Sequence, residues 1–207
     1  MVCRYPNDSI DRFWWRYVSK RNDVNVTTQN VNVNGIPDYP PMAVLQTNLI
    51  ADNITINLAE DFRNVFTTST VTGSHMYFVV LFFAEIDPRV NAPGQRVVDL
   101  TVNGGVFVEA ADIYADASGT YNGLEYYTNT SIPLGPYSDN IIIEATAKTN
   151  SSYPAAIAGA EVLQLFDHSM NATTPTSSSD GMYNCSPHTH TRTHYVLRHI
   201  TSYCLFD

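Results

Sequence analysis

The feature that most limits the fold of this 207-residue chain is a series of short segments in which apolar and polar residues alternate. In residues 96–102, apolar side chains at every second position would face one side of a β-sheet. Asn103-Gly104-Gly105 comes next, which is a hairpin-turn signal, and residues 106–108 are the expected return strand. Residues 140–148 alternate in the same way. This spacing predicts antiparallel sheets.

Residues 76–86 form an almost continuous apolar run that is rich in Val, Phe and Tyr. Its length alone would allow a helix, but its composition favours a strand that is buried on both faces. Further strand candidates are residues 42–50, 54–58 and 156–166. Together these segments predict an all-β fold, an antiparallel β-sandwich of the jelly-roll type, with its core between about Met42 and Phe166.

One segment near the N-terminus has helical periodicity instead. Between Asp8 and Val18, apolar residues recur at the spacing of one helix face, and Asp8 is a suitable N-cap. The apolar positions are Ile10, Phe13, Trp14, Tyr17 and Val18. We therefore expect a short N-terminal helical turn.

The C-terminal part has a different character. Residues 170–180 are polar and rich in Ser and Thr, and the residues after them lack periodicity. We expect a β-sandwich domain over residues 1–167, followed by a polar linker and an unstructured tail over 168–207. Cys185, His188, His190 and His194 offer metal ligands, but without a folded frame we expect no metal and no cofactor.

The charge of the chain restricts its partners. The net charge is −9 and only two lysines are present, so a nucleic acid or an anionic membrane surface would be repelled. Residues 22–170 hold sixteen acidic and four basic residues, which favours a neutral or cationic partner. The longest apolar run has nine residues, against the ~20 needed to span a membrane. The N-terminus lacks the apolar core of a signal peptide, so we expect neither a signal peptide nor a membrane span in this chain.

Acceptor motifs for N-glycosylation, Asn-x-Ser/Thr, are about twice as frequent as the roughly three that chance predicts. This excess favours a glycoprotein, and hence a piece of a longer extracellular protein; the alternative is an Asn-rich sequence that never meets a glycosyltransferase. The motifs begin at Asn7, Asn25, Asn53, Asn129, Asn150, Asn171 and Asn184.

The sequence contains candidate catalytic acids, but it contains no recognisable catalytic motif. A glycosidase needs two carboxylates at a fixed separation, and adjacent acids at strand ends are usually solvated. The nucleophile elbow, the phosphate-binding glycine loop and the kinase motifs are all missing. We therefore expect no enzyme activity. The acids considered are Glu60, Asp61, Glu85, Asp87, Glu109 and Asp112.

An aromatic segment at residues 113–127 is the candidate ligand site. Sugar rings stack on aromatic side chains while their hydroxyl groups bind polar neighbours, so this segment would suit a carbohydrate or a peptide. The alternative is an edge loop whose tyrosines pack on the core. The candidate residues are Tyr114, Tyr121, Tyr126 and Tyr127, with Asp112 and Asp116.

Several motifs resemble those of plant malectin-like domains, in the same order over residues 5–167. Residues 5–14, Tyr-Pro-Asn-Asp-Ser-Ile-Asp-Arg-Phe-Trp, resemble the opening of the second half of these domains. Phe83-Ala84-Glu85-Ile86 is similar to their Phe-Ala-Glu-Ile/Val, and residues 98–104 to their Phe-Asp-x-x-x-Asn-Gly. Residues 154–165 resemble the closing strand more loosely.

The resemblance implies a β-sandwich in the ectodomain of a plant receptor-like kinase, at the extracellular face of the plasma membrane. It further implies a non-enzymatic recognition module for a carbohydrate or cell-wall glycan, or alternatively for a secreted peptide or co-receptor. The animal namesake is a diglucose-binding lectin, whose sugar-binding residues do not carry over. Here Asp87-Pro88 follows the Phe-Ala-Glu motif, and residues 151–159 hold no acidic residue.

Overall fold

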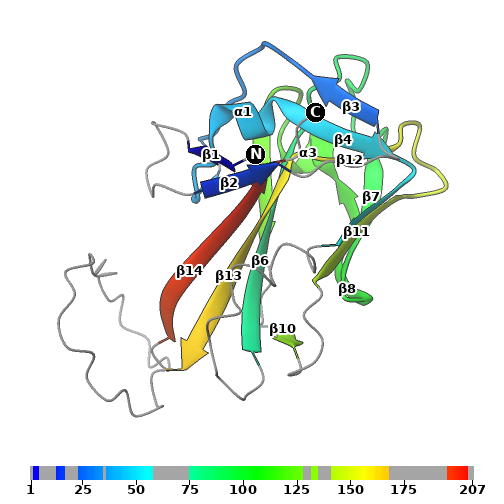
Figure 1. Ribbon diagram of the computed structural model, residues 1–207. Helices are drawn as coiled ribbons and strands as arrows, with labels where there is room; N and C mark the ends of the chain where they lie inside the picture. Colours follow the sequence, from blue (N-terminus) through cyan, green and yellow to red (C-terminus); the bar gives the residue numbers. More distant parts are fainter. Residues whose placement is uncertain are drawn as a thin grey trace, which may run out of the picture.

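Figure 1 shows the computed structural model, which describes residues 2–4, 13–16, 23–34, 36–57, 75–127, 132–134, 141–167 and 195–204. Within these residues the chain is built from three β-sheets and two helices of one turn each. All strand pairs are antiparallel except β14 with β2. The predicted all-β, antiparallel fold is therefore confirmed.

The largest sheet has the order β1 (Val2–Arg4), β2 (Phe13–Arg16), β14 (Tyr195–Cys204), β13 (Gly159–Asp167), β6 (His75–Ala84) and β10 (Ile132–Leu134), with β9 (Gly123–Tyr127) also paired to β6. The second has the order β5 (Asn53–Asn57), β11 (Ile142–Ala147), β7 (Val97–Val102) and β8 (Gly105–Asp112). The third has the order β12 (Ala155–Ile157), β4 (Thr47–Ala51) and β3 (Asp23–Val26). The helices are α1 (Met42–Leu45) and α3 (Ile113–Asp116).

Strand β6 lies at the centre of the core and is covered on both faces, as its composition predicts. Tyr77, Val79, Leu81 and Phe83 point into a cluster formed with residues of all three sheets. The alternate residues Val80, Phe82 and Ala84 point into a second cluster. Val31, Val33, Ile36 and α1 close that second cluster, which explains why residues 78–84 of β6 are all apolar.

The predicted hairpin at residues 96–108 is confirmed, and it continues further than expected. Asn103 and Gly104 have φ values of 51° and 75°, the left-handed pair that a two-residue hairpin turn requires. The return strand β8 extends to Asp112 and is shifted twice against β7. At one shift the Asp99 carboxylate accepts a hydrogen bond of 2.8 Å from the Ala110 amide, which the ladder leaves unpaired.

Two of the predicted strands are divided in the structure. Residues 42–50 begin as helix α1 and become strand β4 only at Thr47. The apolar Val44 and Leu45 are buried either way, so alternation could not separate a helical turn from a strand here. Residues 156–166 are split at Ala158, whose amide turns to donate a hydrogen bond to the Phe82 carbonyl. Strands β12 and β13 therefore belong to different sheets.

The predicted N-terminal helical turn is wrong where the structure describes it. Residues 13–16 form strand β2, which pairs antiparallel with β1 and parallel with β14. Aromatic residues favour strands when neighbouring strands can cover them, and this long-range pairing overrides the local helical spacing. The remainder of residues 8–18 lies outside the described residues.

The predicted unstructured tail is also wrong over residues 195–204. This segment is strand β14, which pairs with the whole length of β13, with one register shift between Gln164 and Leu165. Without this segment, the edge of β13 opposite β6 would be unpaired. A segment that contains Val, Leu, Ile and Tyr can complete the sheet there. Residues 168–194 and 205–207 lie outside the described residues.

Candidate functional site

The segment from Asp112 to Tyr127 forms helix α3, a turn and strand β9 rather than an open loop. Asp112 fixes the start of the segment, because its carboxylate accepts hydrogen bonds from the amides of Ala115 at 3.1 Å and Gly94 at 2.5 Å. Tyr114 is half-buried, and its carbonyl accepts a hydrogen bond of 2.8 Å from Gly119. Both predicted residues therefore help to shape the segment.

The other predicted tyrosines differ in exposure. Tyr121 packs against the second core cluster, and its amide donates a hydrogen bond of 2.7 Å to the Glu85 carbonyl. The Tyr126 hydroxyl donates to Asp116, and its ring meets Phe83 edge-on with 5.5 Å between the ring centroids. Burial and the Asp116 carboxylate raise the pKa of Tyr126, so its hydroxyl stays protonated. Tyr127 is 53% exposed and is the ring that faces solvent.

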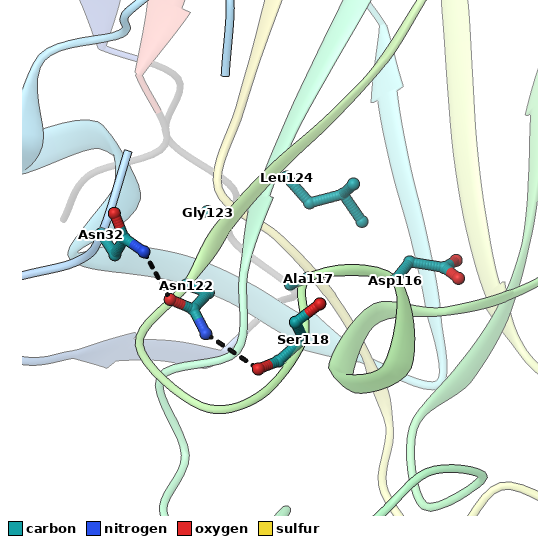
Figure 2. A pocket seen from close by; sticks show the side chains of 7 residues that line it. All are labelled: Asn32, Asp116, Ala117, Ser118, Asn122, Gly123 and Leu124. Carbon is teal, nitrogen blue, oxygen red and sulfur yellow. Dashed lines mark hydrogen bonds between the residues drawn. The ribbon is translucent and has the colours of Figure 1, made fainter. Parts of the chain in front are cut away.

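A pocket of about 300 Å³ lies beside this segment (Figure 2). The Asn32 side-chain amide donates to the Asn122 side-chain oxygen at 3.0 Å, and the Asn122 amide donates to the Ser118 carbonyl at 3.0 Å. These bonds fix the polar rim, and the pocket lining also includes Ser118 with its hydroxyl and Asp116 with its carboxylate. The lining residues are Asn32, Asp116, Ala117, Ser118, Asn122, Gly123 and Leu124.

Of the predicted site residues, the structure places Asp116 in the lining of this pocket. Asn32 is not among the predicted site residues. It is separated from Asn122 by 90 residues in the sequence, and an isolated parallel bridge brings the two together. Ser118 and Asn122 lie inside the predicted segment, and their polar side chains beside Asp116 were the available signal.

Gly123 explains how the two sides of the pocket come so close. Its amide donates a hydrogen bond of 2.8 Å to the Asn32 carbonyl. A Cβ atom at Gly123 would overlap Ile36 Cδ1, and would lie 3.1 Å from Leu45 Cδ1 and 3.3 Å from the Asn32 carbonyl oxygen. Only glycine allows β9 to approach residues 31–36 at this distance.

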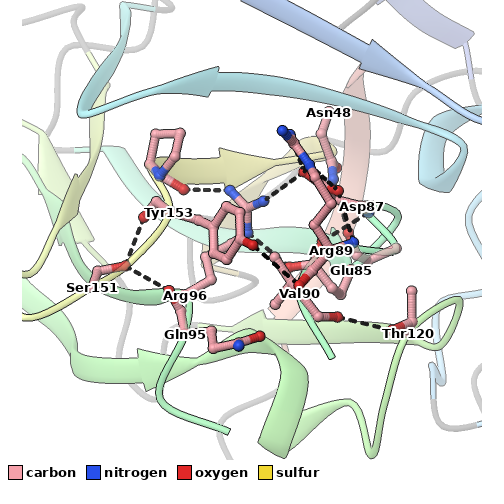
Figure 3. A network of polar contacts seen from close by, with 12 residues as sticks. Asn48, Glu85, Asp87, Arg89, Val90, Gln95, Arg96, Thr120, Ser151 and Tyr153 are labelled. Carbon is pink, nitrogen blue, oxygen red and sulfur yellow. Dashed lines mark hydrogen bonds and ion pairs between the residues drawn. The ribbon is translucent and has the colours of Figure 1, made fainter. Parts of the chain in front are cut away.

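A separate network of charges is buried after β6 and before β7 (Figure 3). Arg96 Nε donates to Glu85 Oε2 at 2.7 Å, and each of these side chains is only 1% exposed. The other Glu85 oxygen accepts a hydrogen bond of 2.9 Å from the Asp87 amide. Arg96 also donates to the Pro154 carbonyl, which ties the start of β12 to the same pair.

Asp87 is bound by Arg89 rather than by a ligand. Its Oδ1 accepts from Arg89 Nε at 2.9 Å and its Oδ2 from Arg89 Nη2 at 2.6 Å. The Tyr153 ring lies 5.8 Å from both guanidinium groups, of Arg89 and Arg96. The hydrogen bonds from Arg89 lower the pKa of Asp87 below its usual 3.8, so the stability they add is present above that pH and is lost as the pH falls through the lowered pKa.

Glu85 and Asp87 resemble an acid–base pair only in the opposite directions of their pKa shifts. Burial raises the pKa of Glu85 against the opposing Arg96 charge, while Arg89 lowers the pKa of Asp87. A catalytic acid or base must reach a substrate. Glu85 is sealed from solvent, and all four carboxylate oxygens accept hydrogen bonds from the protein. This network holds loops together, and both of its carboxylates are buried.

Three of the predicted glycosylation sites lie among the described residues. Asn53 and Asn150 are exposed, and Asn25 is half-buried on β3. Asn7, Asn129, Asn171 and Asn184 lie outside the described residues, as do Glu60, Asp61 and the Cys185–His194 cluster. In the part of the chain that the structure describes, no group of three His, Cys, Asp or Glu residues is arranged to hold a metal ion. No helix among these residues is long and apolar enough to cross a membrane.

Two curated proteins of Arabidopsis thaliana are related to this chain. Receptor-like protein 4 is 31% identical over 118 residues, which are 55% of this chain and 18% of that protein. A protein described as a leucine-rich repeat receptor-like serine/threonine-protein kinase is 27% identical over 169 residues, which are 80% of this chain and 17% of that protein. The chain thus spans less than a fifth of the length of these relatives.

Solved structures share the fold at low sequence identity. The ANXUR1 extracellular domain from Arabidopsis thaliana has a TM-score of 0.59 at 14% identity, over 76% of this chain and 43% of that chain. A structure of the plant peptide RALF23 in complex with FER and LLG2 has a TM-score of 0.56 at 14% identity, over 76% of this chain and 44% of that chain. The family model for the malectin-like domain matches residues 1–165 of the 207. This chain therefore belongs to the malectin-like domain family.

Proposed function

We propose that this chain is a non-enzymatic recognition module in the extracellular part of a plant receptor-like kinase or receptor-like protein. Its α3–β9 face, defined here as residues 114–127 with Asn32, would bind a secreted peptide, alone or together with a co-receptor. The observation that carries this proposal is the exposed pocket with its fixed asparagine rim. The receptor-like relatives support the extracellular placement.

The chemistry of the pocket suits a peptide. The side-chain oxygens of Asn32 and Asn122 accept hydrogen bonds from the protein, but each side-chain amide has a second N–H that can donate to a main-chain carbonyl. Asp116 adds a negative charge at the same place, which favours a cationic ligand. The complex of RALF23 with FER and LLG2 gives a precedent for this class of partner on a similar fold.

A carbohydrate is the second candidate, and the exposed ring of Tyr127 favours it. This ring is 53% exposed, lies beside the Phe78 ring and belongs to the end of β9 away from Gly123, outside the pocket lining. A volume of about 300 Å³ is at the lower end of ligand pockets and suits one sugar ring. Tyr121 and Tyr126 support this candidate less, because their rings pack on the core.

Replacing Asn122 with alanine is expected to weaken binding of a peptide and co-receptor pair by about tenfold, since the variant removes one fixed polar contact worth about 1.4 kcal/mol. The measurement is surface plasmon resonance on the immobilised full chain, with RALF23 and LLG2 as the first probes. Asn91→Ala, at an exposed asparagine in another loop, is the matched control and should bind like the unaltered chain.

The same immobilised chain separates the two ligand classes. If glucose oligosaccharides bind, and Tyr127→Ala abolishes that binding, the carbohydrate candidate replaces the peptide. Peptide binding of equal strength in Asn122→Ala and Asn91→Ala would show that the α3–β9 face is not the contact.

A further inference from the structure

Two sets of asparagines in the described part of this chain differ in what their side chains do. Four asparagines outside the glycosylation motif use their side chains to hold the fold. Asn48 is buried and donates to the Ala84 carbonyl at 2.8 Å, and Asn103 accepts from the Ile142 amide at 2.8 Å. Asn32 and Asn122 form the pocket rim. Asn53 and Asn150 are exposed and each begins an Asn-x-Ser/Thr motif, and no hydrogen bond among the described residues uses either side chain.

We propose that Asn53 and Asn150 are N-glycan acceptor sites, an inference that rests on the extracellular placement proposed above. Thr55 and Ser152 supply the motif hydroxyls, and both residues are exposed. Asn25 is half-buried within β3 and is not included in the proposal.

The fold leaves room for a glycan at both positions. Asn53 is the first residue of β5, the outer strand of its sheet, and follows the bend at Asp52. Asn150 lies in the turn after β11. That turn is held by its other residues, because Ser151 Oγ donates to the Tyr153 carbonyl at 2.6 Å and the Ser152 amide donates to the Gln95 carbonyl at 2.8 Å. A glycan on Asn150 therefore replaces water and no structural bond.

The two acceptors lie on the same rim of the four-stranded sheet. Asn53 pairs with Thr146, and Asn150 follows that residue by four positions. The α3–β9 face is reached from β8, the outer strand at the opposite edge of this sheet. Asn53 therefore lies on the edge of the sheet opposite to the strand that leads into this face.

N-glycosylation transfers an oligosaccharide from a lipid carrier to the asparagine side chain. The Asn Nδ2 atom forms a bond to the anomeric carbon of an oligosaccharide that is activated as a polyprenyl pyrophosphate. The bond from that carbon to the pyrophosphate oxygen breaks, the polyprenyl pyrophosphate leaves, and Nδ2 loses one proton. The product is a neutral glycosyl amide.

The test is peptide mass spectrometry of the full chain, secreted from cultured plant cells with an added leader peptide. Peptides that contain Asn53 and Asn150 should carry glycans. Thr55→Ala and Ser152→Ala should each remove one glycan from the intact mass, whereas Thr55→Ser and Ser152→Thr should keep it. Asn91→Gln, outside the motif, should leave the glycan mass unchanged.

Secreted protein with a predominantly unmodified Asn53 or Asn150 would overturn the assignment of that site. Because the leader delivers the chain, the result is independent of whether the α3–β9 face binds a peptide. The two proposals can therefore fail separately.

Discussion

Replacing Arg96 with methionine is expected to lower the free energy of unfolding by about 3–5 kcal/mol, because it leaves the Glu85 carboxylate buried without its counter-charge. Both side chains are 1% exposed, so water cannot take over the role of the guanidinium group. The Pro154 carbonyl loses its donor as well. Urea unfolding followed by tryptophan fluorescence measures the change.

Two further variants separate the buried charge from other causes. Arg96→Met combined with Glu85→Leu removes both charges and should recover most of the loss, because neutral side chains of similar size can fill the same space. Lys148→Met breaks a partly exposed pair with Asp99, at 2.8 Å, and should cost much less than Arg96→Met, because water screens this pair. A small loss in Arg96→Met would show that Glu85 is hydrated or protonated and that the pair does not hold the loops.

Replacing Gly123 with alanine is the second large effect, with an expected loss of about 1–3 kcal/mol from overpacking. The added Cβ atom overlaps Ile36 Cδ1, and Ile36 is 1% exposed within the second core cluster. The Asn32 carbonyl and Leu45 close the other sides. Thermal unfolding of Gly123→Ala, compared with the unaltered chain, gives the size of the effect.

A double-mutant cycle tests whether this overlap is the cause. Ile36→Val removes the Cδ1 atom and alone costs about 0.5–1.5 kcal/mol. Combined with Gly123→Ala it should relieve the overlap. The double variant should then be more stable than the sum of the two single losses predicts, by about 1 kcal/mol or more. Strictly additive losses would mean that β9 does not lie this close to residues 31–36.

The strands that could be predicted are those whose signal is local. Strand β6 carries its apolar residues without interruption, and the hairpin of β7 and β8 carries both alternation and a glycine turn. Strands β2 and β14 could not be predicted, because each is stabilised by pairing with a segment from the other end of the chain. Helical spacing at residues 8–18 and irregular spacing near the C-terminus gave no hint of that pairing.

The candidate site could be predicted in part for the same reason. The segment 113–127 was identified from its tyrosines and aspartates, and Asp116 does line the pocket. The tyrosines are placed differently than a stacking platform requires, since Tyr121 and Tyr126 face the core. Asn32 enters the pocket through a bridge to Asn122 that no spacing rule anticipates. Similarly, Arg96 is buried together with its bonds to Glu85, which follows β6, and to Pro154, which precedes β12. No local pattern brings these two segments together.

Hydrogen–deuterium exchange of the full chain, measured alone and with RALF23 and LLG2, tests the α3–β9 face most directly. We expect slower amide exchange on binding in residues 115–124 and 31–34, and unchanged exchange in the turn at residues 149–153. Slower exchange confined to that turn, or exchange that is unaltered throughout the chain, would contradict recognition through this face.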